Sequence, residues 1–520
     1  MMSLIERLQN SALYDHPVDQ FEVIETHISW VLLTGEYVYK IKKPVNFGFL
    51  DFSTLEKRRF YCEEELRLNQ RLAPKLYLQV VTIKGTVEKP ELNGQGPVIE
   101  YAVKMRQFPQ SSQLDHLLQE SGLDTAIMDK LADKVARFHL TNRSVDQDSV
   151  YGDFDHISQP VAENFTQVRA CIHDPVIIQR LDKLEQWSQH QLTALASIIE
   201  SRKAQGFIRE CHGDMHLRNI ALWQNEIVLF DCIEFNENFY WIDVMSEIAF
   251  LVMDLEDRQQ AHLAQHFLNR YLEFTGDYAG LQVFLFYKVY RAMVRVKVAA
   301  LRCAQEETSS EIFKQTWLEL QQYLNLAEEY IRPAIPCLII NFGLSGSGKS
   351  VGSRLLAEKL PAIQLRSDVE RKRLFNVAID DDADTIKEAI LYSSDATKKT
   401  YEHLADIAGC LLEANYSVII DAANLKQWQR QLFINLAKSM QVIHVIFAYH
   451  ADEDILKQRV IERIQKNDDA SDATPEVLLS QLKSYEPLTA EEQLITIKID
   501  TGKPVNVDKI ITTQLSPYIL

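Results

Sequence analysis

The chain has 520 residues, and a single hydrophobic core rarely grows beyond roughly 250–300 residues, so two or more domains are expected. Hydrophobic residues make up 46% of the chain and charged residues 25%, which is ordinary for a globular protein. The formal net charge of -18 disfavours a general nucleic-acid-binding protein, because phosphate backbones require clustered Lys and Arg.

The 7 cysteines are scattered and contain no CxxC pair, which predicts reduced thiols rather than a disulfide framework. The first ten residues, MMSLIERLQN, lack an apolar signal core, and no apolar run is long enough to span a bilayer. We therefore expect a cytoplasmic protein without a membrane partner.

The N-terminal part begins with predicted strands and continues mainly with helices. Two strands, 28–33 and 37–42, flank Thr34-Gly35-Glu36, a composition that suits a hairpin. The remaining predicted elements are a strand over 98–105 and helices over 54–72, about 113–205 and 244–330.

Two prolines, Pro333 and Pro336, interrupt the helical pattern and predict a linker. The following run, 337–342, is almost entirely apolar, as expected of a buried parallel strand. Similar runs separated by helical segments occur at 363–365, 417–420, 442–448 and 494–499. This alternation predicts an α/β domain with a parallel sheet, and divides the chain into domains 1–332 and 333–520.

The segment from Gly343 to Ser350 fits the pattern G-x-x-x-x-G-K-S and lies between a predicted strand and a predicted helix. In this context glycines let backbone N–H groups surround phosphates, and the helix N-terminus adds positive potential. Lys349 is expected to reach the β- and γ-phosphates, and the Ser350 hydroxyl to bind Mg²⁺. The predicted nucleotide-binding residues are Gly343, Ser345, Gly346, Ser347, Gly348, Lys349 and Ser350.

Four further residues of this domain are candidates for phosphoryl transfer. Asp368 could accept a proton from a substrate hydroxyl, or could simply cap a helix. Asp421 ends an apolar run, where it could lie near Mg²⁺ or serve as a turn residue. Arg459 and Arg463 lie one helical turn apart and either stabilise the transferred group or form a solvated face. The polar segment 467–474 is predicted to be the tip of a lid over this site.

A second motif lies in the N-terminal part, at His212-Gly213-Asp214, with Asn219 five residues after the aspartate and Asp231 twelve further on. Phosphoryl transfer of the protein-kinase type needs these groups: a carboxylate that receives the acceptor proton, an Asn that binds Mg²⁺, and a second Asp that holds Mg²⁺ against the phosphates.

This motif resembles that of the aminoglycoside phosphotransferase and choline kinase family, and the resemblance covers about residues 20–330. It implies a protein kinase-like α+β fold with Asp214 as the base and with Asn219 and Asp231 as Mg²⁺ ligands. It also implies that Asp243 supports the catalytic loop and that His212 is structural.

In the same family a strand lysine contacts the α- and β-phosphates and pairs with a helix glutamate. Lys40 and Glu65 are the predicted pair, because Lys40 ends a strand and Glu65 shares a helical face with two leucines. Lys42, on the same strand face, and Glu64 are the alternatives. Residues 105–108 are expected to form the hinge that meets adenine.

Some features of the N-terminal part leave other interpretations open. It has no G-x-G-x-x-G motif, so the turn 25–28 would have to cover the phosphates. Cys211, His212 and His216 are metal-binding residue types, but no fourth ligand with suitable spacing is present. The domain could also have kept the fold as a regulatory module, although Asp214 and its partner residues favour catalysis.

The C-terminal segments LRSDVERKRL, VIIDAAN and QRVIERI resemble a branch of small P-loop kinases. That branch is similar to zeta toxins, chloramphenicol phosphotransferase and polynucleotide 5′-kinases, and the resemblance covers about residues 337–515. It implies a P-loop NTPase fold, and the match at Asp368 favours phosphorylation of a hydroxyl. The whole chain resembles bacterial fusions of two such kinases.

Together these features predict a bifunctional phosphotransferase. Each domain is expected to bind ATP, or another nucleoside triphosphate, with Mg²⁺ and to phosphorylate a small-molecule hydroxyl. Two alternatives remain: one domain regulates while the other catalyses, or the C-terminal domain is a polynucleotide 5′-hydroxyl kinase.

Overall fold

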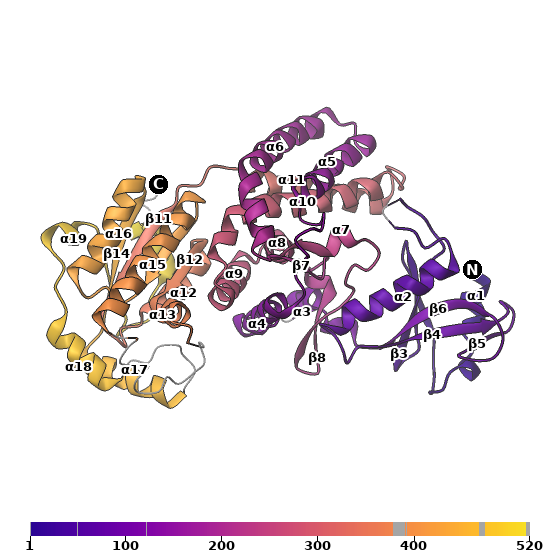
Figure 1. Cartoon of the computed structure of the whole chain (residues 1–520), viewed down its shortest axis with the longest axis horizontal. Coiled ribbons are helices and arrows are strands. Elements are labelled where there is room, and N and C mark those ends of the chain that lie inside the picture. Colours follow the sequence, from indigo (N-terminus) through magenta and orange to yellow (C-terminus); the bar gives the residue numbers. More distant parts are fainter. Residues whose placement is uncertain are drawn as a thin grey trace. The chain divides into compact units, whose positions relative to one another are not determined.

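A computed structural model describes residues 2–48, 50–120, 122–377, 391, 393–466 and 474–515. The chain forms two compact units (Figure 1). The first comprises Met1–Asp257 and Phe286–Ala327, and the second comprises Arg258–Leu285 and Glu328–Leu520. The second unit thus includes a segment that the sequence placed in the N-terminal domain, and the domain boundary after residue 332 stays a prediction.

The first unit begins with a six-stranded antiparallel sheet in the order β1-β2-β3-β6-β4-β5. The predicted hairpin is confirmed, since β2 pairs with β3 over the whole length of β2. The elements of this part are α1 (Met2–Leu8), β1 (Glu22–Glu25), β2 (Ser29–Leu33), β3 (Tyr37–Lys42), α2 (Leu55–Gln70), β4 (Tyr77–Gly85), β5 (Pro90–Leu92) and β6 (Val98–Arg106).

Helix α2 packs across β4 and β6 (Figure 1). It begins where the Thr54 side chain accepts a hydrogen bond from Lys57 N, which caps the helix. Its buried face carries Cys62, Leu68 and also the carboxylate of Glu65. A buried carboxylate requires a partner, so the packing of α2 already predicts a cation on the sheet opposite Glu65.

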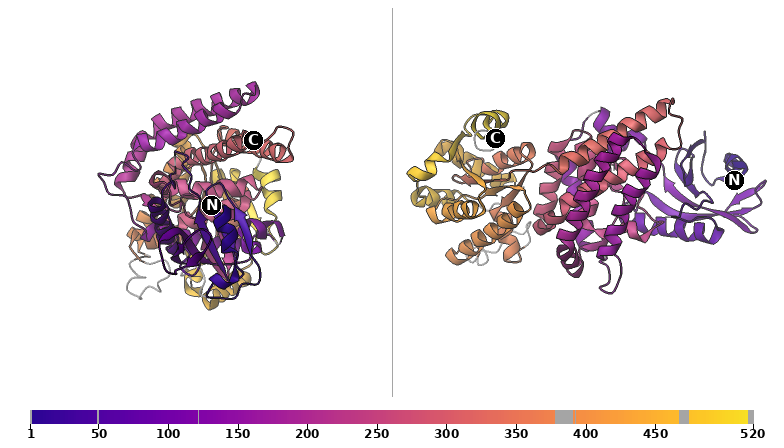
Figure 2. Two further views of the ribbon diagram at one scale, coloured as in Figure 1. Left: turned by 90° about the vertical axis from the view of Figure 1, so that its right-hand side faces the viewer. Right: turned by 90° about the horizontal axis from the view of Figure 1, so that it is seen from above.

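The helical part of the first unit stands beside this sheet (Figure 2). Helix α8 is buried on all sides from Val244 to Leu255, as expected of a helix at the centre of a core. None of the described helices is long and apolar enough to cross a membrane. The elements are α3 (Leu114–Glu120), α4 (Thr125–Thr141), α5 (Phe154–Cys171), α6 (Pro175–Ala204), β7 (Ile208–Glu210), β8 (Ile220–Trp223), β9 (Glu226–Leu229), α7 (Glu237–Tyr240), β10 (Trp241–Asp243), α8 (Val244–Asp257), α10 (Leu281–Cys303) and α11 (Glu311–Tyr330).

The second unit contains a five-stranded sheet in the order β12-β13-β11-β14-β15, with every neighbouring pair parallel. This confirms the predicted α/β domain. Its strands are β11 (Cys337–Phe342), β12 (Ala362–Arg366), β13 (Ser417–Asp421), β14 (Ile443–His450) and β15 (Thr496–Asp500). Its helices are α9 (Ala261–Thr275), α12 (Lys349–Lys359), α13 (Ser367–Leu374), α15 (Ser394–Glu413), α16 (Gln427–Met440), α17 (Glu453–Lys466), α18 (Pro475–Ser484), α19 (Ala490–Leu494) and α20 (Val507–Ile510).

Helix α9 packs along β12, the edge strand of this sheet. The Asn269 side chain accepts a hydrogen bond from Gln364 N (2.8 Å) and donates one to Ala362 O (3.0 Å). Gln265 Nε2 donates to the same carbonyl (2.8 Å). These side chains satisfy backbone groups that an edge strand otherwise presents to a further strand.

Candidate active sites

A cavity of about 610 Å³ lies in the first unit. Strands β1–β3 and β6 form one side of it, and the predicted hinge contributes Met105 through Phe108. Thr26 and Ile28, from the turn expected to cover the phosphates, also line it. Lys40, Asp214 and Asp231 face the same space, so residues from three distant parts of the chain meet there.

Lys40 connects the sheet, α2 and the segment after β9. Its Nζ lies 2.8 Å from Glu65 Oε1 and 2.5 Å from Asp231 Oδ1. Burial alone would raise the pKa of Glu65, but the nearby Lys40 and Lys42 lower it to about 2. The carboxylate therefore stays ionised, and the predicted pair of Lys40 and Glu65 comes together beside Asp231.

Lys42, the alternative lysine, is fully buried. Its Nζ lies 2.7 Å from Glu65 Oε2 and also pairs with Glu234, a residue that the sequence analysis missed. Burial would lower the pKa of Lys42, but Glu234 and Glu65 raise it above its usual value. Lys40 lines the cavity, whereas Lys42 holds the sheet to the segment behind it. Glu64, the other alternative, pairs with an arginine on the same helix.

Asp214 and Asn219 lie together in the predicted catalytic loop. Asn219 Nδ2 donates to both the backbone oxygen and Oδ2 of Asp214, each at 3.0 Å. His216 Nε2 lies 3.3 Å from the same Oδ2. Burial would raise the pKa of Asp214, but His216, together with His212 and Arg295, holds that pKa below its usual range. The carboxylate is therefore available as a hydrogen-bond acceptor.

The backbone of this loop is held by charged side chains of α8 and α10. Glu247 accepts hydrogen bonds from the backbone N–H groups of residues 212–213, at 2.6 and 2.9 Å. Asp254 accepts from Leu217 N (2.9 Å), and Arg291 donates to the carbonyl of residue 213 (3.3 Å). None of the three was predicted from the sequence, although the carboxylates of Glu247 and Asp254 within the apolar helix α8 are a usable signal.

Asp243 supports the loop indirectly. Its carboxylate pairs with Arg202 at 2.7 and 2.8 Å and accepts a hydrogen bond from Met245 N at the start of α8. The side chain that binds the loop is Glu247, one turn further along this helix. Asp243 thus fixes the beginning of the helix that carries Glu247.

Asp231 has a left-handed backbone, with φ of 63°. Such a conformation is uncommon outside glycine and is often kept where function requires it. The surrounding backbone is fixed, because Asp231 N donates to Tyr77 Oη (3.1 Å) and Cys232 N donates to Asn69 Oδ1 (2.9 Å). This geometry holds the carboxylate beside Lys40.

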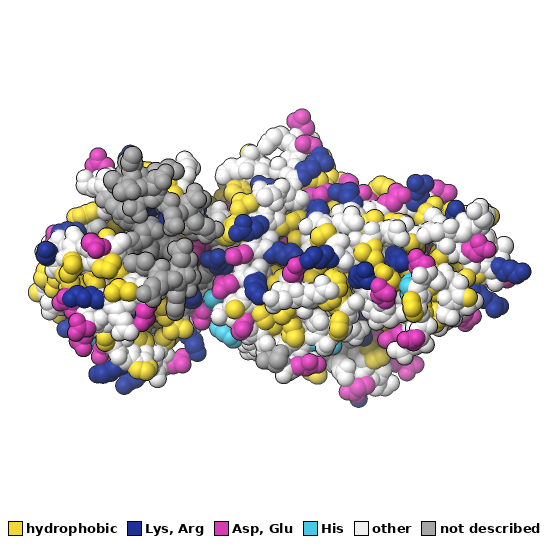
Figure 3. Space-filling model, turned by 90° about the horizontal axis from the view of Figure 1, so that it is seen from below, with side chains coloured by type: hydrophobic (Ala, Val, Ile, Leu, Met, Phe, Trp, Pro, Cys, Tyr) yellow, Lys and Arg dark blue, Asp and Glu magenta, His cyan; other side chains and the backbone are white. Residues whose placement is uncertain are grey.

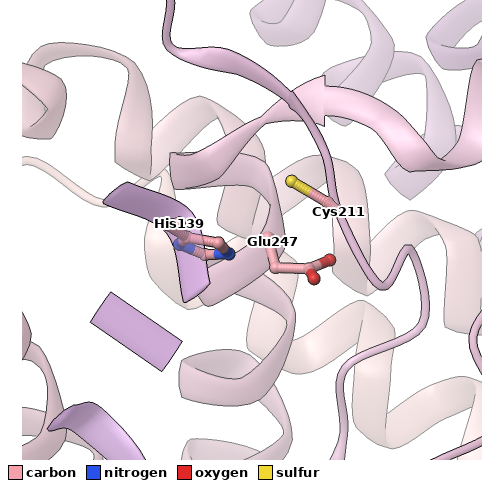
Figure 4. Close-up of side chains that lie close together, drawn as sticks. All are labelled: His139, Cys211 and Glu247. Carbon is pink, nitrogen blue, oxygen red and sulfur yellow. The ribbon is translucent and has the colours of Figure 1, made fainter. Parts of the chain in front are cut away.

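One group of potential metal-ligating residues occurs among the described residues: His139, Cys211 and Glu247, all buried (Figure 4). It differs from the predicted alternative, since it contains neither His212 nor His216. Burial raises the pKa of the Cys211 thiol, whereas a metal needs the thiolate. Both oxygens of Glu247 already bind loop amides. The group therefore fits a buried support of the catalytic loop and not a metal centre.

The P-loop of the second unit depends on glycine geometry. Gly346 and Gly348 have φ of 79° and 81°, and a Cβ at position 346 would lie 2.6 Å from Leu456 O. Lys349 begins α12, and its Nζ donates to the carbonyls of residues 343–344 at 2.9 and 2.8 Å. The strand, loop and helix follow in the order that the motif requires.

Helix α17 brings the two predicted arginines to the P-loop. Arg459 donates to Thr501 O (2.6 Å), to Thr501 Oγ1 (3.0 Å) and to Gly346 O (3.4 Å). Burial lowers the pKa of Lys349 to about 8, Asp421 opposes this shift, and the charge of Arg463 adds to it. Arg463 lies one turn after Arg459 on the same helix.

Asp368 and Asp421 follow neighbouring strands. Arg366, directly before α13, binds the Asp368 carboxylate at 2.8 and 3.2 Å and keeps its pKa low against the effect of burial. Burial raises the pKa of Asp421, which accepts hydrogen bonds from Gln364 (2.8 Å) and Asn341 (3.3 Å). Gln364 and Asn341 were not predicted, because amides carry no motif of their own.

The other predicted P-loop residues lie at the same turn. Ser345 N donates to Gln481 Oε1 of α18 (2.8 Å), Ser347 O accepts from Thr501 Oγ1 (2.9 Å), and Ser350 lies in the first turn of α12. Of the predicted lid tip, residues 467–473 lie outside the described residues. Thr474 caps α18.

Two family models match the chain. Residues 38–284 match the phosphotransferase enzyme family, and residues 338–488 match the AAA domain. Uncharacterized proteins of Mycobacterium tuberculosis and Mycobacterium bovis are 28% identical over 468 residues, which are 89% of this chain and 90% of theirs. The match therefore extends over both units.

Solved structures resemble portions of the chain. A choline/ethanolamine kinase family protein from Mesorhizobium loti is 11% identical, with a TM-score of 0.38, covering 63% of this chain and 100% of that one. A gluconokinase from Sinorhizobium meliloti is 19% identical, with a TM-score of 0.24, covering 34% and 89%. On the family matches, the chain combines an aminoglycoside phosphotransferase-type domain with a P-loop kinase-like domain, and it is a kinase.

Proposed function

We propose that both domains transfer the γ-phosphoryl group of a nucleoside triphosphate to a hydroxyl of a small molecule. The observation that carries this proposal is the meeting of Lys40, Glu65, Asp231 and Asp214 at one cavity. In the transfer, the acceptor oxygen forms a bond to the γ-phosphorus while the bond to the β-phosphate oxygen breaks. Asp214 takes the acceptor proton, and the nucleoside diphosphate leaves.

The donor set of the N-terminal site fits Mg²⁺. Asp231 offers carboxylate oxygens. The amide nitrogen of Asn219 donates a hydrogen bond to Asp214, so the amide oxygen of Asn219 remains for a cation. Oxygen donors are those that Mg²⁺ prefers. When bound, this ion would neutralise charge on the phosphates. Lys40, held by Glu65, would bind the phosphates directly and fix their position relative to Asp214.

In the C-terminal domain, we assign nucleotide binding to the P-loop and its Lys349. Ser350 and Asp421 would hold Mg²⁺, and Asp368 would receive the proton from the acceptor. Arg459 and Arg463 would stabilise the transferred phosphoryl group. The support is geometric: α12, α13 and α17 bring these side chains to one end of the parallel sheet.

Small-molecule acceptors agree better with the charge distribution than polynucleotide ends do. Lys and Arg side chains alternate with Asp and Glu on the face drawn in Figure 3, and the chain carries a formal charge of -18. Salt-dependent binding of short oligonucleotides would favour the polynucleotide alternative.

The test is ADP release from MgATP by the wild type, Asp214→Asn, Lys349→Ala and the double variant. We expect each single variant to lose the part of the ADP release that comes from its own domain, and the double variant to release no ADP. Loss of a positioned base lowers transfer by roughly 10²–10⁴-fold, so the N-terminal share should nearly vanish in Asp214→Asn while nucleotide still binds. Asp146→Asn, at an exposed aspartate, is the matched control.

If only one variant changed ADP release, the other domain would be assigned to regulation. Unchanged N-terminal turnover in Asp214→Asn would refute the role of this residue as the base. Unchanged nucleotide affinity of the C-terminal site in Lys349→Ala would refute the P-loop assignment.

A further inference from the structure

The residues that line the cavity of the first unit include a group that does not belong to the predicted nucleotide-binding elements, and we call the region that they line the acceptor part. Helices α5 and α10 and the segment after β9 line this acceptor part. Its apolar residues are Phe235, Phe239, Tyr290, Val294, Val298 and Leu301. An acceptor bound here would lie against Asp214, and its body would lie against these side chains.

Helix α10 presents a continuous apolar stripe to this part. Tyr290, Val294, Val298 and Leu301 recur at helical spacing, so they share one face, and Lys297 lies beside them. Val298 is 49% exposed and Leu301 is 38% exposed. An apolar ligand would remove this surface from water, which is favourable.

The charged side chains that line the cavity are balanced in sign. Its described carboxylates are Glu163, Asp214, Asp231 and Glu234, and its described basic side chains are Lys40, Arg106, Arg291 and Lys297. Of these carboxylates, Glu163 comes from α5, on the acceptor part.

Glu163 and Lys297 line the same part of the cavity. Burial lowers the pKa of Lys297, and the charge of Glu163 opposes this shift only in part. The acceptor part therefore has a carboxylate and an ammonium group together, and no surplus of negative charge. A ligand with several ammonium groups would need several free carboxylates to replace its lost hydration.

Two of the aromatic rings that line the cavity, Phe250 and Tyr290, already have a cation beside them. The Arg291 guanidinium lies 5.0 Å from the centre of the Phe250 ring and 5.5 Å from that of Tyr290. These ring faces already bind a cation, and the charge of Arg291 repels another one. Burial, and then Arg291, lower the pKa of Lys297, as expected where additional positive charge is unfavourable.

We propose that the acceptor of the N-terminal domain is an alcohol without a positive charge, with an apolar body that lies along α10 between Phe235, Phe239 and Val298. This inference rests on the proposed function, since it places the acceptor hydroxyl at Asp214. It separates this domain from enzymes that phosphorylate cationic aminoglycosides or choline, although the fold is of that type.

A matched pair of probes tests the charge. Choline and 3,3-dimethylbutan-1-ol have nearly the same shape, but the second lacks the positive charge. Binding of each probe to the full-length Lys349→Ala chain can be measured by ligand-observed NMR in the presence of ADP and Mg²⁺. We expect the neutral alcohol to bind at least about tenfold more tightly, because Lys297 and Arg291 line the acceptor part together with Glu163 and leave a buried cation without net compensation.

Equal or tighter binding of choline, tighter binding of the polycation kanamycin, or binding of no probe would overturn the inference. Binding of the neutral alcohol without its phosphorylation would support the acceptor part and count against the proposed transfer, so the two failures are distinguishable. A second variant tests the location. Val298→Asp should weaken the binding of the neutral probe about tenfold. Val176→Asp, at an exposed valine of α6, should leave its affinity unchanged.

Discussion

The two candidate sites are held in place by different means. In the N-terminal site, buried acidic side chains fix the functional groups: Glu65 holds Lys40, and Glu247 holds the backbone of the catalytic loop. In the C-terminal site, the main-chain conformation fixes the functional groups, because Gly346 and Gly348 adopt left-handed conformations and α12 follows directly. The first arrangement depends on pairs of charges removed from water, and the second on local conformation.

This difference has energetic consequences. Removing one partner of a buried ion pair leaves a charge without compensation and is strongly destabilising, by about 3–5 kcal/mol. A glycine loop instead fails by steric conflict at individual positions, such as residue 346 against Leu456 O. We therefore expect substitutions of charged residues to destabilise the N-terminal unit most. In the C-terminal unit, we expect the largest effects from substitutions that disturb the backbone of the P-loop or of the edge strand β12.

The largest expected effect separates the two lysines of β3. Lys42→Met should lower the free energy of unfolding by about 3–5 kcal/mol, because it leaves Glu234 buried without its partner. Lys40→Met should cost less stability but remove most N-terminal turnover, since Lys40 lines the cavity beside Asp231. Urea unfolding and MgATP turnover of both variants measure the two properties.

Arg59→Met, at an exposed ion pair of α2, is the control for loss of a surface charge. Exposed pairs contribute about 0–1 kcal/mol, so this variant should resemble the wild type in both measurements. If Lys42→Met lost turnover while Lys40→Met kept it, the phosphate-binding role would pass to Lys42.

The same contrast explains which features the sequence could predict. The P-loop was predictable because its glycines, lysine and serine are consecutive. Lys40 and Glu65 were predictable because strand alternation and a helical face fix their directions. Glu234, Glu247 and Arg291 were missed because their partners lie far away in the sequence, and only the packed core brings them together.

The assignment of α9 to the second unit was missed for a related reason. The periodicity of residues 244–330 predicts helices but does not tell which sheet a helix covers. The decisive groups are the amides of Gln265 and Asn269, which bind the backbone of β12. Such side-chain amides have no distinctive sequence pattern.

Asn269→Ala tests the role of this edge in the C-terminal unit. The change removes partners of Gln364 N and Ala362 O, and a buried group left unsatisfied costs about 1–3 kcal/mol. We expect a lower free energy of unfolding by about 2 kcal/mol and faster amide hydrogen exchange at Gln364. Gln364 also binds Asp421, so the C-terminal site should loosen with the strand.

Hydrogen exchange of a peptide that covers residues 360–367 provides the direct measurement. Asn435→Ala, at an exposed asparagine of α16, is the matched control and should leave this peptide unchanged. Equal protection of Gln364 in Asn269→Ala and the wild type would show that α9 is not needed to close the edge.

The smallest effect concerns pH and His139, which is buried near Glu247 under the catalytic loop (Figure 4). Burial lowers the pKa of His139 from 6.5 to about 3. Between these values the unfolded chain binds a proton that the folded chain does not, so the free energy of unfolding falls as pH falls from 6.5 toward 3. Above pH 6.5 the histidine contributes no such dependence.

At pH 5.5 this linkage amounts to about 1.4 kcal/mol relative to neutral pH. His139→Gln removes the titrating group, so its unfolding free energy should decline less between pH 7.5 and 5.5 than that of the wild type, by about this amount. Urea unfolding at both pH values measures the difference, with His190→Gln, at an exposed histidine, as the control. Parallel pH dependences of the wild type and His139→Gln would mean that the acid sensitivity of the N-terminal unit resides in its ion pairs instead of this neutral ring.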